Sequence, residues 1–277
     1  MKEQLEEIGN VQTLKDFRVK GNLVVLIFEN FKLKILPETY EEFKFVVGRD
    51  YKKDFLYQVI FINDKYTAEK YIISRVSKYM YSEYEAKQLL LKKFDNISSD
   101  AIDGAISDLC NGDVLNDEKY ASQYKDFFDN SYYGKYYITN YLSLKHISQE
   151  IINELTFDSK FETEKCKKYF ELIKNKYVSN NYAKQKKKIF DGLLKRGFGN
   201  DISLSFLASI KVDPYLEEKK LIRSYLKCKK KYETKKSDLN YKSITNKIIS
   251  HLVYEGYEYN DIIRIIKKDE EGEIKND

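Results

Sequence analysis

The sequence lacks tryptophan, and its 277 residues include only 2 prolines, 2 histidines and 3 cysteines. Cys110, Cys166 and Cys228 are scattered and form no CxxC pair, so we expect buried thiols in a reducing cytoplasm, neither disulfides nor metal ligands. His146 and His251 are too far apart for the H-x-x-x-H spacing of zinc enzymes. We therefore expect no metal site and no cofactor.

Long apolar runs and catalytic motifs are missing as well. The longest apolar run, Leu23 to Phe28, is far too short to cross a bilayer, and the N-terminal residues do not resemble a signal peptide. There is no G-x-S-x-G or G-x-x-x-x-G-K-[ST] motif, and Asp100, Asp103 and Asp108 are spread around a predicted helix. We expect a cytoplasmic binding protein with no membrane partner, not an enzyme.

What the sequence does contain is a repeat of about fifty residues, marked by an anchor leucine in each copy. The anchors are separated by 52, 51 and 59 residues and are Leu90, Leu142, Leu193 and Leu252. Apolar residues recur at similar offsets around the last three anchors, and more loosely around the first. This self-similarity predicts a stack of helical units, none of which buries its apolar face alone.

The period of the apolar residues divides the chain into a strand-rich start and a helical remainder. Before residue 66, apolar and charged residues alternate, Gly21-Asn22 and Glu29-Asn30 fit hairpin turns, and Pro37 is suited to open a short helix. We predict a mainly α protein of tandem three-helix repeats, preceded by a small antiparallel β-containing N-terminal module. The expected ranges are 1–65 for the module, 66–113, 114–160, 161–212 and 213–268 for the repeats, and 269–277 for an acidic disordered tail.

Single positions support these helix boundaries. Ser82 and Glu85 have the spacing of a capping box. Gly197 and Gly256 occupy the same repeat position, just past a helix end, where a left-handed residue is favoured. His146 takes this position in the second repeat, at some cost in backbone strain.

The positive charge is concentrated in the C-terminal half. The whole chain has 49 basic and 44 acidic residues, a net charge of +5. Residues 161–268 have 26 basic and 13 acidic side chains, a net charge of +13, whereas residues 66–160 and 269–277 each have a net charge of −4. Lysine richness alone is typical of AT-rich genomes, but this uneven distribution indicates an anionic partner.

Two lysine clusters stand out in this half. The first lies at a helix start, where positive charge opposes the helix dipole unless anions are near, and consists of Lys184, Lys186, Lys187 and Lys188. The second runs from a helix end into a loop and consists of Lys227, Lys229, Lys230, Lys231, Lys235 and Lys236. Six lysines exceed what a helix end requires, and basic residues beside tyrosines suit a single nucleic-acid strand. We predict that both clusters contact DNA phosphate or an acidic protein surface; a solvated helix face is the alternative.

Aromatic residues and one arginine complete the candidates. The tyrosines at 132, 133, 136 and 137 flank Gly134, and their helical spacing is more typical of a core between units than of a base-stacking platform. Arg196 is one of six arginines in a lysine-rich chain, which suits a bidentate contact to an anion, with a structural ion pair as the alternative. We group Arg196 with the candidate binding residues.

The stretch LNDEKYASQY, which starts at Leu115, resembles the middle repeat of the RecX family of regulatory proteins. That repeat starts with (Y/F)-L-N-D-x-x-(F/Y)-A, has a glycine before its second helix, and closes with L-x-x-K-G-I. The family-motif residues, all expected to be structural, are Leu115, Asn116, Asp117, Tyr120, Ala121, Gly134, Leu142, Ile147, Leu193, Gly197, Phe198 and Gly256. Asn116-Asp117 is expected to cap the helix that follows. The chain departs from the family at Met80, Val114 and His146, where arginine, an aromatic residue and glycine are usual.

The resemblance spans about residues 66–268 and implies an elongated, curved molecule. It also implies a function, which is to modulate the recombinase RecA by lodging in the groove of the RecA filament on single-stranded DNA. Family members limit filament growth and so restrain recombination and the SOS response. The expected partners are RecA and single-stranded DNA, with duplex DNA as a further candidate, and we expect a monomer. The alternative is a stand-alone DNA-binding protein, because three-helix units resemble helix-turn-helix modules.

Overall fold

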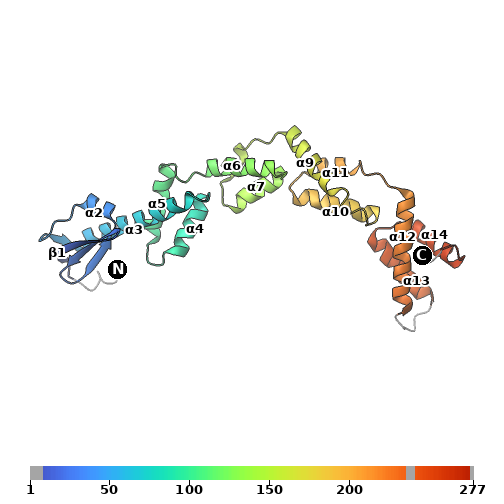
Figure 1. Cartoon of the computed structure of the whole chain (residues 1–277), viewed down its shortest axis with the longest axis horizontal. Helices are drawn as coiled ribbons and strands as arrows, with labels where there is room; N and C mark the ends of the chain where they lie inside the picture. Colours follow the sequence, from blue (N-terminus) through green and yellow to red (C-terminus); the bar gives the residue numbers. More distant parts are fainter. Residues whose placement is uncertain (1–8, 235–240, 275–277) are drawn as a thin grey trace. The chain divides into compact units, whose positions relative to one another are not determined.

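The computed structural model describes residues 9–234 and 241–274. It is mainly helical, with a four-stranded antiparallel sheet near the N-terminus and tandem groups of three helices after it, which confirms the predicted fold class (Figure 1). The chain divides into two compact units, one built from residues up to 123 with 142–154, the other from 124–141 with the residues after 154. Within the described ranges, no helix has both the length and the apolar character that a membrane span requires.

The sheet has the strand order β3-β2-β1-β4. β1 (Val11–Lys20) turns into β2 (Leu23–Phe28) at Gly21, whose φ of 61° suits a two-residue hairpin turn. Alternate residues of β2 and of β3 (Lys32–Ile35) are buried, as their sequence pattern predicts. β4 (Asp50–Lys52) was not predicted from the sequence, because three residues give no measurable alternation; this strand pairs with the start of β1.

A short helix, α2 (Pro37–Phe43), follows β3 and begins at the proline as predicted. It is tied to the next helix by Asn63, whose side-chain oxygen accepts the backbone N–H of Leu36 at 2.8 Å. The hydroxyl of Thr39 donates to the same oxygen at 3.4 Å. The amide of Asn63 therefore fixes the start of α2 in the absence of a side-chain cap at Leu36.

One continuous helix, α3 (Lys53–Val76), connects the sheet with the first three-helix group (Figure 1). Leu56 and Val59 lie in the core of the sheet, whereas Ala68 and Ile72 lie in the core of the helical group. The module boundary expected at residues 65 and 66 therefore falls inside a helix. The segment contains no proline or glycine, so the backbone continues while the buried face changes its packing partner.

The first helical group combines the end of α3 with α4 (Glu83–Lys93) and α5 (Ser99–Asn111). The predicted capping box is confirmed, because the Ser82 hydroxyl accepts the N–H of Glu85 and the Glu85 carboxylate accepts the N–H of Ser82, both at 3.2 Å. The core between these helices includes Ala86, Leu90, Ala101, Ile102, Ala105 and Leu109.

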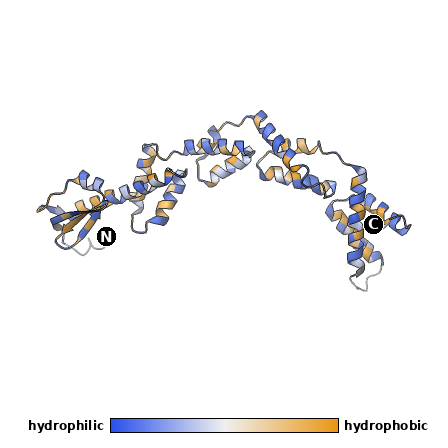
Figure 2. Ribbon diagram, viewed as in Figure 1, coloured by the Kyte–Doolittle hydropathy of each residue, from blue (hydrophilic) through white to orange (hydrophobic). Residues whose placement is uncertain are grey.

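Three further groups follow along the chain, and hydrophobic and hydrophilic residues recur along their helices (Figure 2). The second contains α6 (Asp117–Asn130), α7 (Lys135–Leu144) and α8 (Gln149–Glu154). The third contains α9 (Ser159–Ile173), α10 (Tyr182–Lys195) and α11 (Asn200–Leu207). The fourth contains α12 (Pro214–Thr234), α13 (Tyr241–Glu255) and α14 (Tyr259–Glu270). The anchors are fully buried at Leu90, Leu142, Leu193 and Leu252.

The turns after the second helices have the predicted left-handed conformation. The φ angles are 59° at His146, 87° at Gly197 and 98° at Gly256. His146 adopts this conformation despite its Cβ, and its ring stacks on Tyr84 with the ring centroids 3.7 Å apart. This contact offsets part of the backbone strain at His146.

The last helix is longer than the sequence predicts. Asp269 and Glu270 belong to α14 and not to an acidic tail. Asp269 accepts hydrogen bonds from Lys229 at 2.5 Å and from the hydroxyl of Tyr225 at 2.7 Å, and Tyr241 donates to Glu270 at 2.7 Å. These tertiary bonds extend the helix beyond the apolar periodicity that defined its predicted end. Residues 275–277 of the expected tail lie outside the described residues.

Candidate functional site

The helical groups are joined by a hydrogen bond that recurs at three junctions. A carboxylate in the first turn of one group's first helix accepts the first backbone N–H of the preceding group's second helix. The pairs are Asp117 with Glu83 at 2.9 Å, Glu162 with Lys135 at 2.8 Å, and Glu217 with Tyr182 at 2.7 Å. Each carboxylate thus satisfies an orphan N–H group at the positive end of a neighbouring helix.

A main-chain carbonyl adds a second bond at each junction. The carbonyl belongs to the residue just before the left-handed turn, and it accepts from the start of the preceding second helix. The pairs are Lys145 with the Ser82 hydroxyl at 3.0 Å, Arg196 with the Gly134 N–H at 2.8 Å, and Glu255 with the Asn181 side-chain amide at 2.7 Å. The end of one second helix therefore rests on the start of the one before it.

The junctions correct the role expected for Asp117. Asn116 does cap α6, because its side-chain oxygen accepts the N–H of Lys119 at 2.9 Å. Asp117 instead caps α4 through its bond to Glu83. Burial raises the pKa of the Asp117 carboxyl, and the nearby carboxylates of Glu83 and Glu85 raise it further, against the lowering effect of the bond from Glu83.

Arg196 lies inside the second junction, which corrects its assignment to the binding surface. Its guanidinium carbon lies 3.7 Å from the ring centroid of Tyr133 and 4.8 Å from that of Tyr169. One terminal nitrogen donates to the carbonyl of Ser131 at 3.0 Å. Two aromatic faces and a carbonyl therefore stabilise the guanidinium charge of Arg196. The alternative prediction, a structural ion pair, would require a carboxylate in their place. The rings of Tyr133 and Tyr137 lie with their centroids 4.1 Å apart and their planes tilted by 34°. Tyr133 also contacts Arg196 of the third group, as predicted for a core between groups, whereas Tyr136 is 59% exposed.

A buried ion network lies beside Arg196. The ammonium of Lys165, a residue only 2% exposed, lies 2.5 Å from Asp129 and 2.9 Å from Glu162, and donates to the carbonyl of Tyr133 at 2.9 Å. Lys125 lies 2.9 Å from the other Asp129 oxygen. Two ammonium groups thus balance two carboxylates whose side chains are only 10% exposed. This network was not predicted, although the i,i+3 and i,i+4 spacings of its members are visible in the sequence.

The first lysine cluster lies on the N-terminal turns of α10. Its members are exposed except Lys186, which is half-buried and donates to the hydroxyl of Tyr182 at 3.3 Å. Lys184 lies 3.9 Å from a carboxylate oxygen of Glu255. Among the described residues, the other three lysines take part in no ion pair, so most of this positive charge remains available at the surface.

The second cluster is divided between a structural and an exposed part. Lys229 is paired with Asp269 at 2.5 Å; burial opposes ionisation of this carboxyl, but the bonds from Lys229 and Tyr225 outweigh it and lower the pKa of Asp269. Three members are exposed on α12, namely Lys227, Lys230 and Lys231. Lys235 and Lys236 lie outside the described residues.

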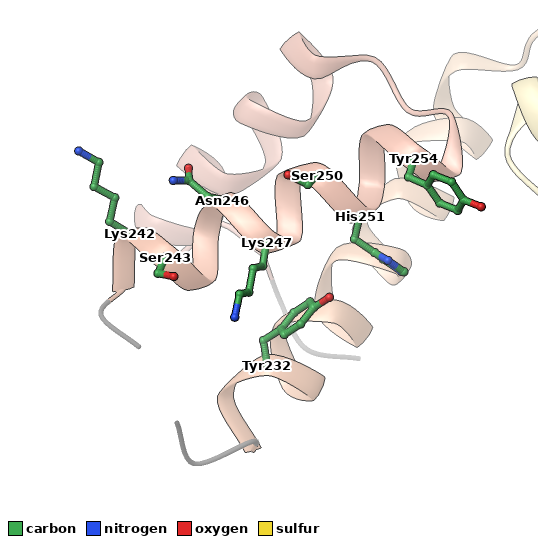
Figure 3. Close-up of a pocket in the computed structure, with 8 residues that line it drawn as sticks. All are labelled: Tyr232, Lys242, Ser243, Asn246, Lys247, Ser250, His251 and Tyr254. Atoms are coloured by element: carbon green, nitrogen blue, oxygen red, sulfur yellow. The ribbon is translucent and has the colours of Figure 1, made fainter. Parts of the chain in front are cut away.

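The structure places Lys184, Lys187 and Lys188 of the first cluster at a hollowed surface of the third and fourth groups, which we call the α13 groove, whereas no described lysine of the second cluster lines it. Its larger hollow, about 860 Å³, is lined by Tyr232, Lys242, Ser243, Asn246, Lys247, Ser250, His251 and Tyr254 (Figure 3). An adjoining hollow of about 510 Å³ is lined by Ala183, Lys184, Lys187, Lys188, Asp191, His251, Tyr254, Glu255 and Gly256. His251 and Tyr254 line both hollows and join them, and the Lys231 ammonium lies 5.5 Å from the Tyr232 ring.

The α13 part of this groove was not predicted from the sequence. Lys242, Lys247, His251 and Tyr254 are separated residues in a run with no obvious charge cluster. The available signal was a polar stripe at helical spacing through Ser243, Lys247, His251 and Tyr254, opposite the buried anchor Leu252 and Ile248. Only the tertiary structure places this stripe beside the first predicted cluster.

The described residues offer little for covalent or metal chemistry. They contain no group of three histidine, cysteine or acidic side chains that could hold a metal ion. The three cysteines are free, and burial raises the pKa of the Cys110 and Cys166 thiols to about 12, so neither is a thiolate near neutral pH. The arrangement favours recognition of an anion by charge, hydrogen bonds and aromatic contact.

Comparisons with known proteins agree with the resemblance in the sequence. No protein-family model matches the chain. The regulatory protein RecX of Haemophilus ducreyi (strain 35000HP / ATCC 700724) is 28% identical over 137 residues, which cover 50% of this chain and 88% of the relative. A crystal structure of regulatory protein RecX matches 72% of this chain and 100% of its own, with a TM-score of 0.60 and 14% identity, and so shows the same fold. A crystal structure of RecX from Lactobacillus salivarius matches 53% of this chain and 96% of its own, with a TM-score of 0.47 and 25% identity.

Proposed function

We propose that this chain, a RecX-family protein by its sequence and its fold, regulates the recombinase RecA by binding the RecA filament on single-stranded DNA and limiting its growth. The observation that carries the proposal is the similarity to regulatory protein RecX along 88% of that relative. The shared fold over 72% of this chain supports it.

The charge distribution supports a filament as the partner. A RecA–DNA filament presents DNA phosphates, and a segment with a formal net charge of +13 in residues 161–268 attracts such a polyanion and speeds its association. Exposed lysines of α10 and α13 line the α13 groove, so several phosphates or acidic side chains can be bound together.

The junctions support a binding mode that keeps this surface in a fixed shape. Asn181 and Glu217 bond α10 to the ends of α13 and α12 within the same compact unit. The lysines of α10 are therefore held at a defined position relative to those of α13, which lowers the entropic cost of binding an extended ligand. A protein bound at a growing end would block the addition of further RecA protomers.

The test is the single-stranded-DNA-dependent ATPase rate of RecA from the same organism, titrated with this protein. Inhibition at a small molar ratio to RecA is expected, because one bound molecule stops growth of a whole filament. The double substitution Lys230→Glu/Lys231→Glu should weaken the inhibition, whereas Lys32→Glu/Lys34→Glu on exposed positions of β3 serves as a matched charge control.

Either result of this titration is informative. If the unmodified protein binds DNA but does not inhibit RecA, regulation of RecA is rejected and a stand-alone DNA-binding protein is favoured. Equal inhibition by both double variants would leave regulation standing but remove the exposed α12 lysines from the contact surface.

A further inference from the structure

The α13 groove has an aromatic residue that the fold does not need. Tyr254 is 89% exposed, and among the described residues its ring takes part in no aromatic or cation–π contact. The same repeat position holds Leu144 in the second group and Lys195 in the third. Since the helix tolerates an aliphatic or a charged side chain there, packing does not explain a tyrosine.

The residues around Tyr254 form a mixed surface of aromatic, hydroxyl and cationic groups. His251 lies one turn before Tyr254 on the same face of α13, and Tyr232 faces this stripe from α12 (Figure 3). Ser250 and Asn246 add short hydrogen-bonding side chains along the larger hollow. This combination can stack against flat rings and hydrogen-bond their edges.

The charge of the groove is positive on both sides of Tyr254. Five lysines line the two hollows together with only two carboxylates, those of Asp191 and Glu255. Within the described part of the chain, Lys187, Lys242 and Lys247 form no ion pair, and Glu255 is already 3.9 Å from Lys184. An extended anion crossing from one hollow to the other would meet lysines before and after the tyrosine.

We propose that the α13 groove is a binding site for single-stranded nucleic acid, with a base stacked on Tyr254 and the flanking phosphates bound by Lys187 on one side and Lys247 on the other. The inference rests on the proposed function for its class of partner, but it requires no RecA. A single strand fits better than a duplex, because only unpaired bases offer their faces to an exposed ring. A single strand also fits better than an acidic protein segment, because carboxylates would pair with the lysines and leave Tyr254 without a contact.

The experiment uses the full-length protein without RecA. Fluorescence anisotropy of a labelled oligothymidylate would measure the affinities of the unmodified protein, Tyr254→Leu and the control Tyr215→Leu. Tyr215 is 65% exposed in the same helical group but lines neither hollow. We expect Tyr254→Leu to bind about tenfold more weakly, as removal of one base-stacking ring does elsewhere, and Tyr215→Leu to be unchanged. Oligouridylate and a duplex of the same length distinguish DNA from RNA and single from double strands.

A second variant reports the contact directly. Because the chain has no tryptophan, Tyr254→Trp introduces a single indole at the groove. Stacking of a base on that indole should quench its fluorescence on addition of oligothymidylate, while Tyr215→Trp should show no quenching. Loss of two phosphate contacts in Lys187→Gln/Lys247→Gln should lower the slope of log affinity against log salt by about 0.7 for each lysine.

Unchanged affinity in Tyr254→Leu together with no quenching in Tyr254→Trp would overturn the proposal. The proposal would also be overturned if the protein bound duplex more tightly than single strands and both Tyr254 variants bound them as the unmodified protein does. If Tyr254→Leu keeps its oligonucleotide affinity but no longer inhibits RecA, the groove binds RecA protein and the nucleic-acid assignment fails while the proposed function stands. If the variants lose oligonucleotide binding and the unmodified protein does not affect RecA, the proposed function fails and the site stands.

Discussion

The carboxylate of Glu162 accepts the backbone N–H of Lys135 at 2.8 Å, so the first helix of one group caps the second helix of the group before it. Helix caps are usually local in sequence, but here the cap comes from 27 residues away. The same relation between Asp117 and Glu83, and between Glu217 and Tyr182, makes the cap part of each junction. Loss of such a carboxylate therefore weakens both a helix and an interface.

Gly197 is expected to be intolerant of a side chain. Its φ is 87°, and a Cβ built there would overlap the backbone nitrogen and Cβ of Tyr137. We predict that Gly197→Ala lowers the free energy of unfolding by at least about 2 kcal/mol, through strain and separation of the second junction. Gly199→Ala is the control, because its Cβ would lie at an ordinary 3.5 Å from the Tyr136 ring. Urea unfolding followed by circular dichroism measures both, and similar midpoints would show that the junction adapts.

Removal of the Lys165 ammonium should be costly. In Lys165→Met, two carboxylates remain in a buried site without their main partner, although the methionine fills most of the volume. We predict a loss of about 3–5 kcal/mol in the free energy of unfolding. Lys167→Met, an exposed position on the same helix, should change the stability little. Comparable losses in both variants would contradict a role of the buried charge.

The stability contributed by Asp117 should depend on pH in an unusual direction. Because burial raises the folded-state pKa of this acid, its ionised form opposes folding above that pKa, and the opposition disappears as the pH falls through it. Asp117→Asn keeps an oxygen acceptor for Glu83 and should be as stable as the unmodified protein, or more so, at neutral pH. Asp117→Ala removes the acceptor and should cost about 1 kcal/mol.

The pH dependence supplies the check on Asp117. The stability of the unmodified protein should rise relative to Asp117→Asn as the pH is lowered from neutral towards the ordinary aspartate pKa of about 3.9. Chemical unfolding of both proteins over this range measures the difference, in which the titration of all other groups cancels. A fall in relative stability on acidification would mean that the bond to Glu83 outweighs burial.

Charge reversal should separate the two parts of the second lysine cluster. Lys229→Glu places a carboxylate beside Asp269 and should lower the thermal unfolding midpoint, because it replaces an ion pair of 2.5 Å by repulsion between like charges. Lys230→Glu/Lys231→Glu should leave the midpoint nearly unchanged and weaken binding of single-stranded DNA, with a smaller dependence on salt. Differential scanning calorimetry and a salt titration test this division. It would be rejected if Lys229→Glu weakened DNA binding and left the midpoint unchanged while Lys230→Glu/Lys231→Glu lowered the midpoint and left DNA binding unchanged.

The repeat was predictable because burial imposes it locally. Leu142, Leu193 and Leu252 recur with their apolar companions because every group must bury the same face of its second helix. Gly197 and Gly256 were predictable for the same local reason, since the turn after that helix requires a positive φ. The junction carboxylates were not predictable, because Asp117, Glu162 and Glu217 precede their anchors by 25, 31 and 35 residues and share no offset.

The sequence by itself determined the fold class, the family resemblance and the basic character of the C-terminal half, because periodicity, motif order and net charge are properties of the linear chain. Tertiary structure alone decided which charges are available. It buries Lys165 among carboxylates, places Arg196 between two tyrosine rings, pairs Lys229 with Asp269, and leaves Lys187 exposed beside the α13 groove. The physical reason is that the groups packed around a lysine or arginine decide whether its role is structural or functional. Residues far apart in the sequence supply those groups.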